Sequence, residues 1–285
     1  MPARPTPGLP VADRTLVMGV LNVTPDSFSD GGRYLDADAA IARGVALARD
    51  GADIVDVGGE STRPGAKRVA PDEELSRVMP VVTALIAEGV PVSIDTMRAA
   101  TAQAAVVAGA CLINDVSGAL ADPRMAGLVA STGVDFVAMH WRAHSTQMDD
   151  LDHYDDVVAE VASELAARVD ALMAAGVDPD RIVLDPGLGF AKVTDSNWPL
   201  LARVGEWSAG RRVLIGASRK RFLGAAISRG GIADPAAELR EHATTAITTL
   251  AAAAGVWAVR VHDARAACDA IAVVSAWQDA TKATR

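Results

Sequence analysis

Short runs rich in Val, Ile and Leu alternate along the chain with longer segments of helical period. The apolar runs lack a strict in–out alternation, which is typical of strands that are buried on both faces. They predict strands at Leu16–Val20, Ile54–Val57, Val92–Ile94, Leu112–Ile113, Phe136–Met139, Ile182–Leu184, Val213–Ile215 and Ala258–Val261. The longer segments predict helices that include Ala37–Asp50, Asp72–Glu88, Thr101–Ala108, Asp156–Ala175 and Pro235–Ala254.

Eight strands, each followed by a helical segment, favour an α/β fold with a parallel sheet. The chain has 285 residues, and a single (β/α)8 barrel of about 250 residues fits that length. A doubly wound sheet is the alternative, but no G-x-G-x-x-G pattern follows the first strand, and no P-loop pattern is present. We therefore predict a single (β/α)8 TIM barrel over residues 15–285, preceded by a flexible, proline-rich arm over residues 1–14.

Composition narrows the class of protein further. The formal net charge is −9 at pH 7, which argues against a general nucleic-acid or membrane-surface binder. The longest uncharged run, at 243–259, is shorter than the ~20 strongly apolar residues of a membrane span. Two cysteines without a zinc-like spacing indicate a reduced, cytoplasmic protein that depends on neither disulfides nor zinc. A small anionic ligand held by a local basic cluster remains compatible with this composition.

Polar or ionisable side chains follow nearly every predicted strand, where a barrel of this kind carries its chemistry. Each one alone has a purely structural explanation, such as a helix N-cap, a satisfied core histidine or a turn. Their convergence on one rim is what those explanations do not cover. The strand ends are Asn22, Glu60–Arg63, Asp95, Asn114, Met139–His140, Asp185, Ser218–Lys220 and Arg260–His262.

Three basic residues, Arg219, Lys220 and Arg221, are predicted to open the helix after the seventh strand. Cations are disfavoured at a helix N-terminus unless an anion is bound there, and barrels hold phosphate at their last two loops. A solvated basic helix start is the alternative. The loops at 22–35 and 58–71 are long and rich in Gly, Ser, Asp and Pro, which indicates binding loops or mobile lids.

Several longer motifs resemble those of the dihydropteroate synthase family. The two most specific runs span Met18–Gly32 and Asp53–Gly65. Shorter matches follow in order at Ser93–Thr96, Ile113–Gly118, Asp185–Lys192, Gly216–Lys220 and Arg260–His262. The one visible departure lies after the fifth strand, at Met139–Ala143, and concerns the shape of that loop.

The resemblance implies an enzyme that joins 4-aminobenzoate to (7,8-dihydropterin-6-yl)methyl diphosphate, with release of diphosphate. It assigns the pterin to Thr62, Asp95, Asn114, Met139, Asp185, Phe190, Gly216 and Lys220. It assigns the diphosphate to Asn22, Arg260 and His262, with Asn22 as the ligand of an Mg²⁺ cofactor. It assigns the aminobenzoate to Phe28, Arg63, Pro64, Ser218 and Lys220. The catalytic set is Asp95, Lys220, Arg260 and His262, acting by charge stabilisation and positioning rather than by a nucleophile.

The resemblance further implies a cytoplasmic homodimer whose partners are these two small molecules, and a target of sulfonamides. Two alternatives share the barrel and part of the pterin site. A non-catalytic paralogue should lose charged residues after the second or seventh strand, yet Arg63, Arg219 and Lys220 are present. A pterin-dependent methyltransferase domain would not need the aminobenzoate loop at 61–65 or a diphosphate site.

Overall fold

The computed structural model describes residues 6–24, 33–61, 68–143, 151–192, 195–228 and 236–283 of the chain. Its strands form one sheet in the spatial order β6-β5-β4-β3-β2-β1-β8-β7, in which every described pairing is parallel. The strands are β1 Leu16–Asn22, β2 Ile54–Gly58, β3 Val92–Asp95, β4 Leu112–Asp115, β5 Asp135–Met139, β6 Ile182–Asp185, β7 Leu214–Ile215 and β8 Ala258–Val261.

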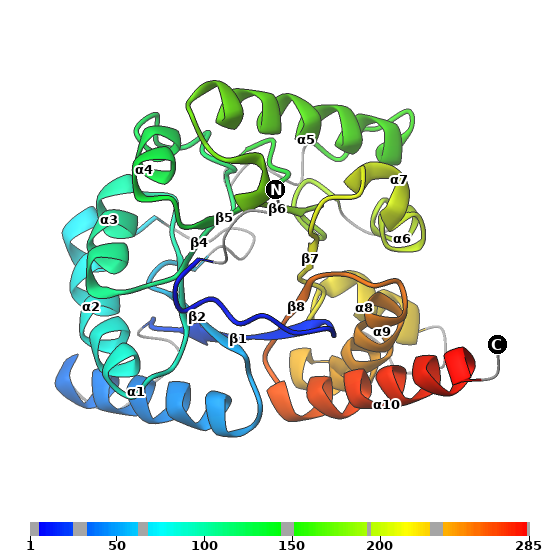
Figure 1. Cartoon of the computed structure of the whole chain (residues 1–285), viewed down its shortest axis with the longest axis horizontal. Helices are drawn as coiled ribbons and strands as arrows, with labels where there is room; N and C mark the ends of the chain where they lie inside the picture. Colours follow the sequence, from blue (N-terminus) through cyan, green and yellow to red (C-terminus); the bar gives the residue numbers. More distant parts are fainter. Residues whose placement is uncertain are drawn as a thin grey trace.

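The two edges of this sheet meet. Leu184 of β6 and Val213 form an isolated parallel bridge, and the backbone N–H of Leu184 donates to the carbonyl of Arg212 at 2.9 Å. The sheet therefore curls into a barrel, with the helices around it (Figure 1). The predicted fold class and all eight predicted strands are confirmed.

The helices follow the strands along the chain. Their bounds are α1 Arg33–Arg49, α2 Pro71–Ala87, α3 Ala99–Ala108, α4 Met125–Thr132, α5 Val157–Ala174, α6 Asn197–Ala202, α7 Val204–Ser208, α8 Arg221–Ser228, α9 Glu241–Ala253 and α10 Ala264–Ala283, with 3₁₀ segments η3 Pro179–Arg181 and η4 Ala237–Arg240. Within the described ranges, no helix has both the length and the apolar character needed to cross a membrane.

Two helix starts differ from the prediction. The segment expected to be helical over Pro235–Ala254 has a 3₁₀ turn, η4, before α9 begins at Glu241. The basic run does not open α8 with all three of its residues, because Arg219 has a φ of +60° and lies in the turn before the helix. Its N–H donates to Thr244 Oγ1 at 3.1 Å and its carbonyl accepts from Arg240 at 3.0 Å, which holds that turn.

The alternation of the strands separates two cores. Val17 and Val55 face outward and join the large cluster shared with the helices. Their neighbours in the chain, Met18 and Ile54, join a smaller cluster with residues of β4–β8, which fills the amino-terminal half of the barrel. Both faces of the strands are thus buried, which explains the apolar runs without alternation in the sequence.

Residues 6–14, the described part of the expected flexible arm, lie against the amino-terminal end of the barrel. Thr6 is buried, donates to Asp135 and accepts from Arg181. Arg14 forms a two-bond ion pair with Asp53, each bond 2.8 Å long. Specific contacts with the barrel therefore hold this part of the arm.

Candidate active site

The predicted site residues lie one pleat beyond the interior core. Because side chains on a strand alternate between its two faces, the residue two positions after an interior residue also faces the barrel interior. Asp56 follows Ile54 in this way, and the pattern recurs on neighbouring strands. Leu112 precedes Asn114, Val137 precedes Met139, Val183 precedes Asp185, Leu214 precedes Gly216, and Ala258 precedes Arg260. The barrel thus turns from apolar to polar at its carboxyl-terminal rim.

Arg260 on β8 bridges two carboxylates across this rim. Its Nε donates to Oδ2 of Asp56 at 2.6 Å, and its Nη2 donates to Oδ2 of Asp95 at 2.8 Å. The amide of Asn114 donates to the same Asp56 oxygen at 2.9 Å. Oδ1 of Asp56 is buried without a hydrogen-bond partner among the described residues. Four strands are therefore joined at the rim by side chains.

Burial dominates the protonation of this cluster. It raises the pKa of Asp95 to about 7, against the lowering effect of Arg260 and with a further raising effect of Asp56. Burial likewise raises the pKa of Asp115, at the end of β4, to about 6. Asp115 accepts from Ser117 and from the N–H of Ala119, so this neighbour of Asn114 acts as a turn and cap residue.

Asp185 and Lys220 form the opposite side of the rim. Burial raises the pKa of Asp185, while the positive charge of Lys220 opposes that shift. Burial lowers the pKa of Lys220 to about 8. Oδ1 of Asp185 also accepts from the N–H of Gly187 at 2.7 Å, so Asp185 forms a turn as well as facing the site. Asp185 is therefore both a turn residue and a buried carboxylate at the rim.

Phe190, Met139 and Gly216 surround that pair. The Lys220 ammonium lies 4.9 Å from the centre of the Phe190 ring and donates to the carbonyl of Leu188. Met139 is buried and stands beside Asp185 in the register of β5 and β6. A Cβ built on Gly216 would lie 3.7 Å from Oδ2 of Asp185, in ordinary van der Waals contact, so Gly216 directly adjoins that carboxylate.

His262 and Ser218 lie together beyond the ends of β8 and β7. Oγ of Ser218 is 2.9 Å from Nδ1 of His262 and accepts from the backbone N–H of His262 at 3.2 Å. Arg219, expected in an anion-binding cluster, instead pairs with Glu241 of α9 at 2.6 Å. That ion pair explains the residue structurally, so Lys220 is the member of the basic run that faces the rim.

Asn22 ends β1 and lies beside Gly58 in the parallel register. Its side chain is half-buried at the rim. Four further predicted residues, Phe28, Thr62, Arg63 and Pro64, lie outside the described residues. Glu60, two residues before Thr62, is described, and it pairs with Arg98 at 2.8 Å.

Sequence reasoning assigned no role to two residues that the structure brings to this region, Asp56 and Lys192. Asp56 carried a signal, since an acidic residue interrupts an otherwise apolar strand. Lys192 lies in the loop after β6 and is 1% exposed, which no local pattern indicates. His140, expected to be either a core or a rim histidine, is buried and pairs with Lys192 Nζ through its Nδ1 at 2.9 Å.

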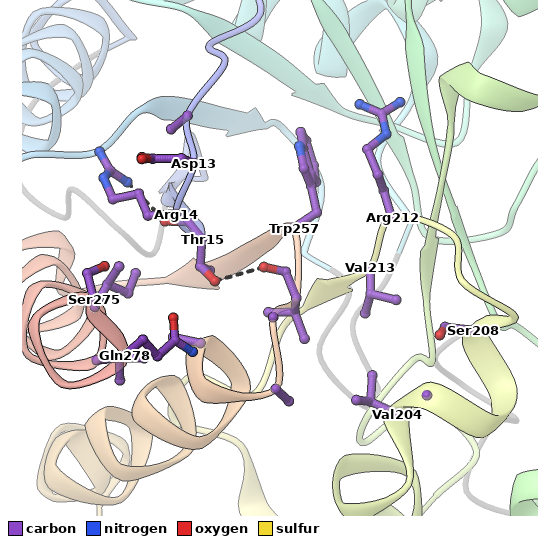
Figure 2. A pocket seen from close by; sticks show the side chains of 18 of the residues that line it. Asp13, Arg14, Thr15, Val204, Ser208, Arg212, Val213, Trp257, Ser275 and Gln278 are labelled. Atoms are coloured by element: carbon purple, nitrogen blue, oxygen red, sulfur yellow. Dashed lines mark hydrogen bonds between the residues drawn. The ribbon is translucent and has the colours of Figure 1, made fainter. Parts of the chain in front are cut away.

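A cavity of about 550 Å³ lies at the other end of the barrel, between the arm, α7 and α10. Figure 2 shows Arg14, Arg212 and Trp257 around it. Its guanidinium groups are already paired, since Arg14 binds Asp53 and Arg212 binds Asp135 at 2.6 Å. It contains none of the predicted site residues, and it opens at the end of the barrel that serves stability rather than chemistry.

The described residues hold no group of three or more His, Cys, Asp or Glu side chains placed to bind a metal ion. Mg²⁺ does not require such a cage, because it commonly takes one or two protein oxygens and completes its shell with phosphate oxygens and water. The amide oxygen of Asn22, half-buried at the rim, is a donor of the hard type that Mg²⁺ prefers.

The chain matches, over residues 18–262, the model of a family described as pterin binding enzyme. A dihydropteroate synthase of Mycobacterium leprae (strain TN) is 56% identical over 263 residues, which cover 92% of this chain and 93% of that protein. A dihydropteroate synthase of Bacillus subtilis (strain 168) is 44% identical over 255 residues, which cover 89% and 85%.

Solved structures agree with these matches. Xanthomonas albilineans dihydropteroate synthase with 4-aminobenzoic acid has a TM-score of 0.86 and 45% identity, covering 93% of this chain and 94% of that one. The enzyme from the same organism in complex with 7,8-dihydropteroate has a TM-score of 0.83 and 42% identity, with the same coverage. Yersinia pestis dihydropteroate synthase in a sulfonamide drug complex has a TM-score of 0.86 and 36% identity, covering 93% and 95%.

Proposed function

The chain belongs to the pterin-binding enzyme family and acts as a dihydropteroate synthase, and from that premise we propose how its rim residues divide the reaction. The predicted activity, a transferase of folate synthesis, is confirmed. In this reaction the amine of 4-aminobenzoate attacks the methylene of (7,8-dihydropterin-6-yl)methyl diphosphate. A C–N bond forms, the C–O bond breaks, diphosphate leaves with the electron pair, and the amine gives up a proton.

The pterin ring binds between the two acidic sides of the rim. Its guanidine-like edge presents several N–H donors, for which Asp185 and Asn114 offer acceptors on interior-facing positions of β6 and β4. Asp95, on β3 between β2 and β4, completes the polar edge. The observation that carries this proposal is the convergence of these three buried side chains on one end of the barrel.

The ring faces pack against apolar groups from the end of β5 and from the loop after β6. Phe190 and Met139 supply an aromatic and a polarizable surface, and Gly216 leaves the space beside Asp185 free of a side chain. Lys220 lies close to both Phe190 and Asp185. It thereby supplies a donor to the pterin ring and a positive charge near the reacting methylene. Thr62, outside the described residues, is assigned to the pterin by family resemblance alone.

The diphosphate binds on the β8 side. Arg260 supplies positive charge, Arg260 and His262 supply hydrogen-bond donors, and Ser218 fixes the imidazole orientation through its contact with Nδ1. Asn22 would hold Mg²⁺, which when bound neutralises charge on the leaving diphosphate. Catalysis then consists of stabilising the departing anion and of holding the ionised Asp95 near positive charge that develops on the pterin.

We assign the aminobenzoate to Ser218 and Lys220 at the rim, together with Phe28, Arg63 and Pro64, which lie outside the described residues and are assigned by family resemblance alone. The Yersinia pestis relative was solved in complex with a sulfonamide drug. Sulfonamides resemble 4-aminobenzoate in shape and charge, so we assign the same position to this class of compound here.

We propose a homodimer in the cytoplasm. Leu250 on α9 and Val273 and Trp277 on α10 are apolar and 65–77% exposed, and α9 and α10 pack side by side (Figure 1). An exposed apolar surface of this kind is typical of a protein–protein contact. The net charge of −9 supports an absence of nucleic-acid partners.

One assay tests the proposed function against its alternatives. Purified chain is mixed with both substrates and Mg²⁺, and release of diphosphate is followed together with formation of 7,8-dihydropteroate. Equal amounts of both products are expected. Pterin binding without any turnover would favour the non-catalytic paralogue, and release of diphosphate without 4-aminobenzoate would contradict the coupling of the two half-sites.

A further inference from the structure

A buried ammonium lies against the backbone of the loop after β6. Lys192 follows β6 and is among the largest fully buried side chains of the described residues, at 1% exposure. Its Nζ contacts the carbonyl of Phe190 at 3.0 Å, the carbonyl of Gly187 at 3.3 Å and Nδ1 of His140 at 2.9 Å. Three acceptors therefore surround one nitrogen.

The hydrogen-bond inventory fixes the protons in this cluster. Burial lowers the pKa of His140 to about 4, so its imidazole is neutral. Its Nε2 lies 2.9 Å from Glu164, whose pKa is held at about 2 chiefly by that hydrogen bond, so Nε2 donates and Nδ1 accepts. An ammonium has three donors, and Lys192 matches them to its three acceptors. The neutral amine would leave one acceptor without a donor.

This cluster joins the loop that directly follows Met139 at the end of β5 to the loop after β6 that carries Phe190. His140 directly follows Met139, and its backbone N–H donates to the carbonyl of Asp185 at 2.8 Å. The loops also touch at Gly187, which has a φ of +66° and where a Cβ would lie 2.4 Å from the carbonyl of His140. The carbonyl of Phe190 itself accepts from Lys192. A change at the ammonium therefore acts directly on the backbone of Phe190, through this hydrogen bond.

We propose that Lys192, oriented by His140, is a positioning residue that holds the loop after β6 so that the Phe190 ring meets the pterin. The inference rests on the proposed pterin-binding role of Phe190. Lys192 contacts the loop at the carbonyls of Gly187 and Phe190, whereas Lys220 contacts the same loop at the carbonyl of Leu188. The two lysines thus hold one segment at different carbonyls, and they have different tasks.

The energetics of Lys192 support a dedicated role. Burial lowers its pKa to about 7, while Asp185 opposes the shift and Lys220 and Arg142 add to it. The other charged or titratable groups that face it are His140, Glu164 and Tyr154. Burying a cation costs free energy that an apolar side chain of the same length would avoid. The contacts to two loop carbonyls give a reason for the lysine.

A double-mutant cycle between Lys192 and Phe190 tests the proposal. Binding of 6-hydroxymethylpterin is measured by calorimetry at pH 6.5 for wild type, Lys192→Met, Phe190→Ala and the double variant. We expect Lys192→Met to weaken binding roughly tenfold, since misplacing a binding group by about 1 Å commonly costs that or more. The double variant should bind within about twofold of Phe190→Ala alone, because Lys192 acts through Phe190.

Two further variants keep the test decisive. Tyr154→Phe removes a different hydrogen bond to the same loop, from Tyr154 Oη to the carbonyl of Ala191 at 3.0 Å, and should leave pterin affinity within twofold. Glu164→Gln changes a side chain that is 40% exposed on α5, so folding is retained. It disturbs the tautomer of His140 and should weaken binding in the same direction as Lys192→Met, by a smaller factor. It serves in place of Lys192→Met if that variant does not fold.

The outcomes distinguish the positioning role of Lys192 from the pterin-binding role of Phe190. Wild-type affinity in Lys192→Met, or effects of Lys192→Met and Phe190→Ala that simply multiply, would overturn the positioning role. Wild-type affinity in Phe190→Ala would overturn the pterin assignment of Phe190 and the inference with it. Faster amide hydrogen exchange at Gly187 and Phe190 in Lys192→Met, with unchanged exchange in β1 and β2, would support it.

Discussion

Nε of Arg260 lies 2.6 Å from Oδ2 of Asp56, and this contact joins two strands that are not neighbours. β1 lies between β8 and β2 in the sheet, so the ion pair reaches over one strand at the rim. Asp56 is fully buried and Arg260 is 23% exposed. Loss of Asp56 would take from Arg260 and Asn114 the buried acceptor that they share, and removing one partner of a buried pair is costly.

We predict that Asp56→Ala lowers the free energy of unfolding by about 3–5 kcal/mol, the range for removing one partner of a buried pair. Urea denaturation measures this loss. Asp269→Ala is the matched control, because Asp269 forms an exposed pair with Arg265 at 3.2 Å and should change stability by less than about 0.5 kcal/mol. Equal effects of both variants would show that the rim pair stabilises the fold no more than an exposed pair does.

Asp95 should make stability depend on pH in a specific window. In the unfolded chain an aspartate has a pKa of about 3.9. In the folded protein, burial raises the pKa of Asp95 to about 7. The folded state then binds more protons between these values, so the stabilising contribution of protonated Asp95 is lost as the pH rises from about 4 to about 7. In Asp95→Asn this slope should become shallower, and the part that remains is due to Asp115 and Asp185, whose pKa values burial also raises. Denaturation curves of both proteins at several pH values test it, and parallel curves would exclude it.

Asp185→Asn should weaken the binding of a pterin analogue by about 1.5–3 kcal/mol, the scale of one charge-assisted hydrogen bond. The turn should survive, because an asparagine carbonyl can still accept from the N–H of Gly187 as Oδ1 of Asp185 does at 2.7 Å. Calorimetry gives the affinity and a thermal melt confirms the fold. An unchanged dissociation constant would show that Asp185 does not bind the pterin and serves only to form the turn.

Lys220→Ala should retain the fold and lose most turnover. The lost hydrogen bond to Leu188 is offset by relief of a buried cation, whose burial lowers its pKa to about 8. Net stability should therefore change by no more than about 1.5 kcal/mol. Steady-state rates and melting curves measure both effects, with Lys282→Ala, an exposed lysine of α10, as control. Wild-type rates in Lys220→Ala with a normal melt would contradict the assignment.

4-Aminobenzoate should bind weakly to the free enzyme and well only when Mg²⁺–diphosphate and a pterin are present. Its assigned contacts Phe28, Arg63 and Pro64 lie on the long loops at 22–35 and 58–71, and ordering a residue costs about 1–2 kcal/mol. Asn22 begins the first loop, which gives the bound anion a means to favour the ordered arrangement. Calorimetric titration with and without Mg²⁺–diphosphate tests this coupling, and equal affinities would indicate a preformed pocket.

The sequence predicts the barrel well because every strand and its turn signals are local. It also predicts Asp95, Asn114, Asp185 and Arg260 at one rim, since strand ends of a parallel barrel must converge. What it cannot predict is pairing across the barrel. That Arg260 meets Asp56, or that Arg219 is held by Glu241 instead of facing the site, depends on side-chain reach between strands and helices far apart in the chain. The buried position of Lys192 depends in the same way on a loop conformation that no short pattern specifies.

The side-chain network that joins β2, β3, β4 and β8 at the rim has a consequence for how this protein can change under selection. A substitution among Asp56, Asp95, Asn114 and Arg260 disturbs pterin binding and the integrity of the barrel together, so few such changes are tolerated. Ser218 and Lys220, the described residues assigned to the aminobenzoate, lie outside this network, so their substitution is expected to leave it intact. Compounds that compete for the aminobenzoate side should therefore lose potency through mutation sooner than compounds that occupy the pterin side.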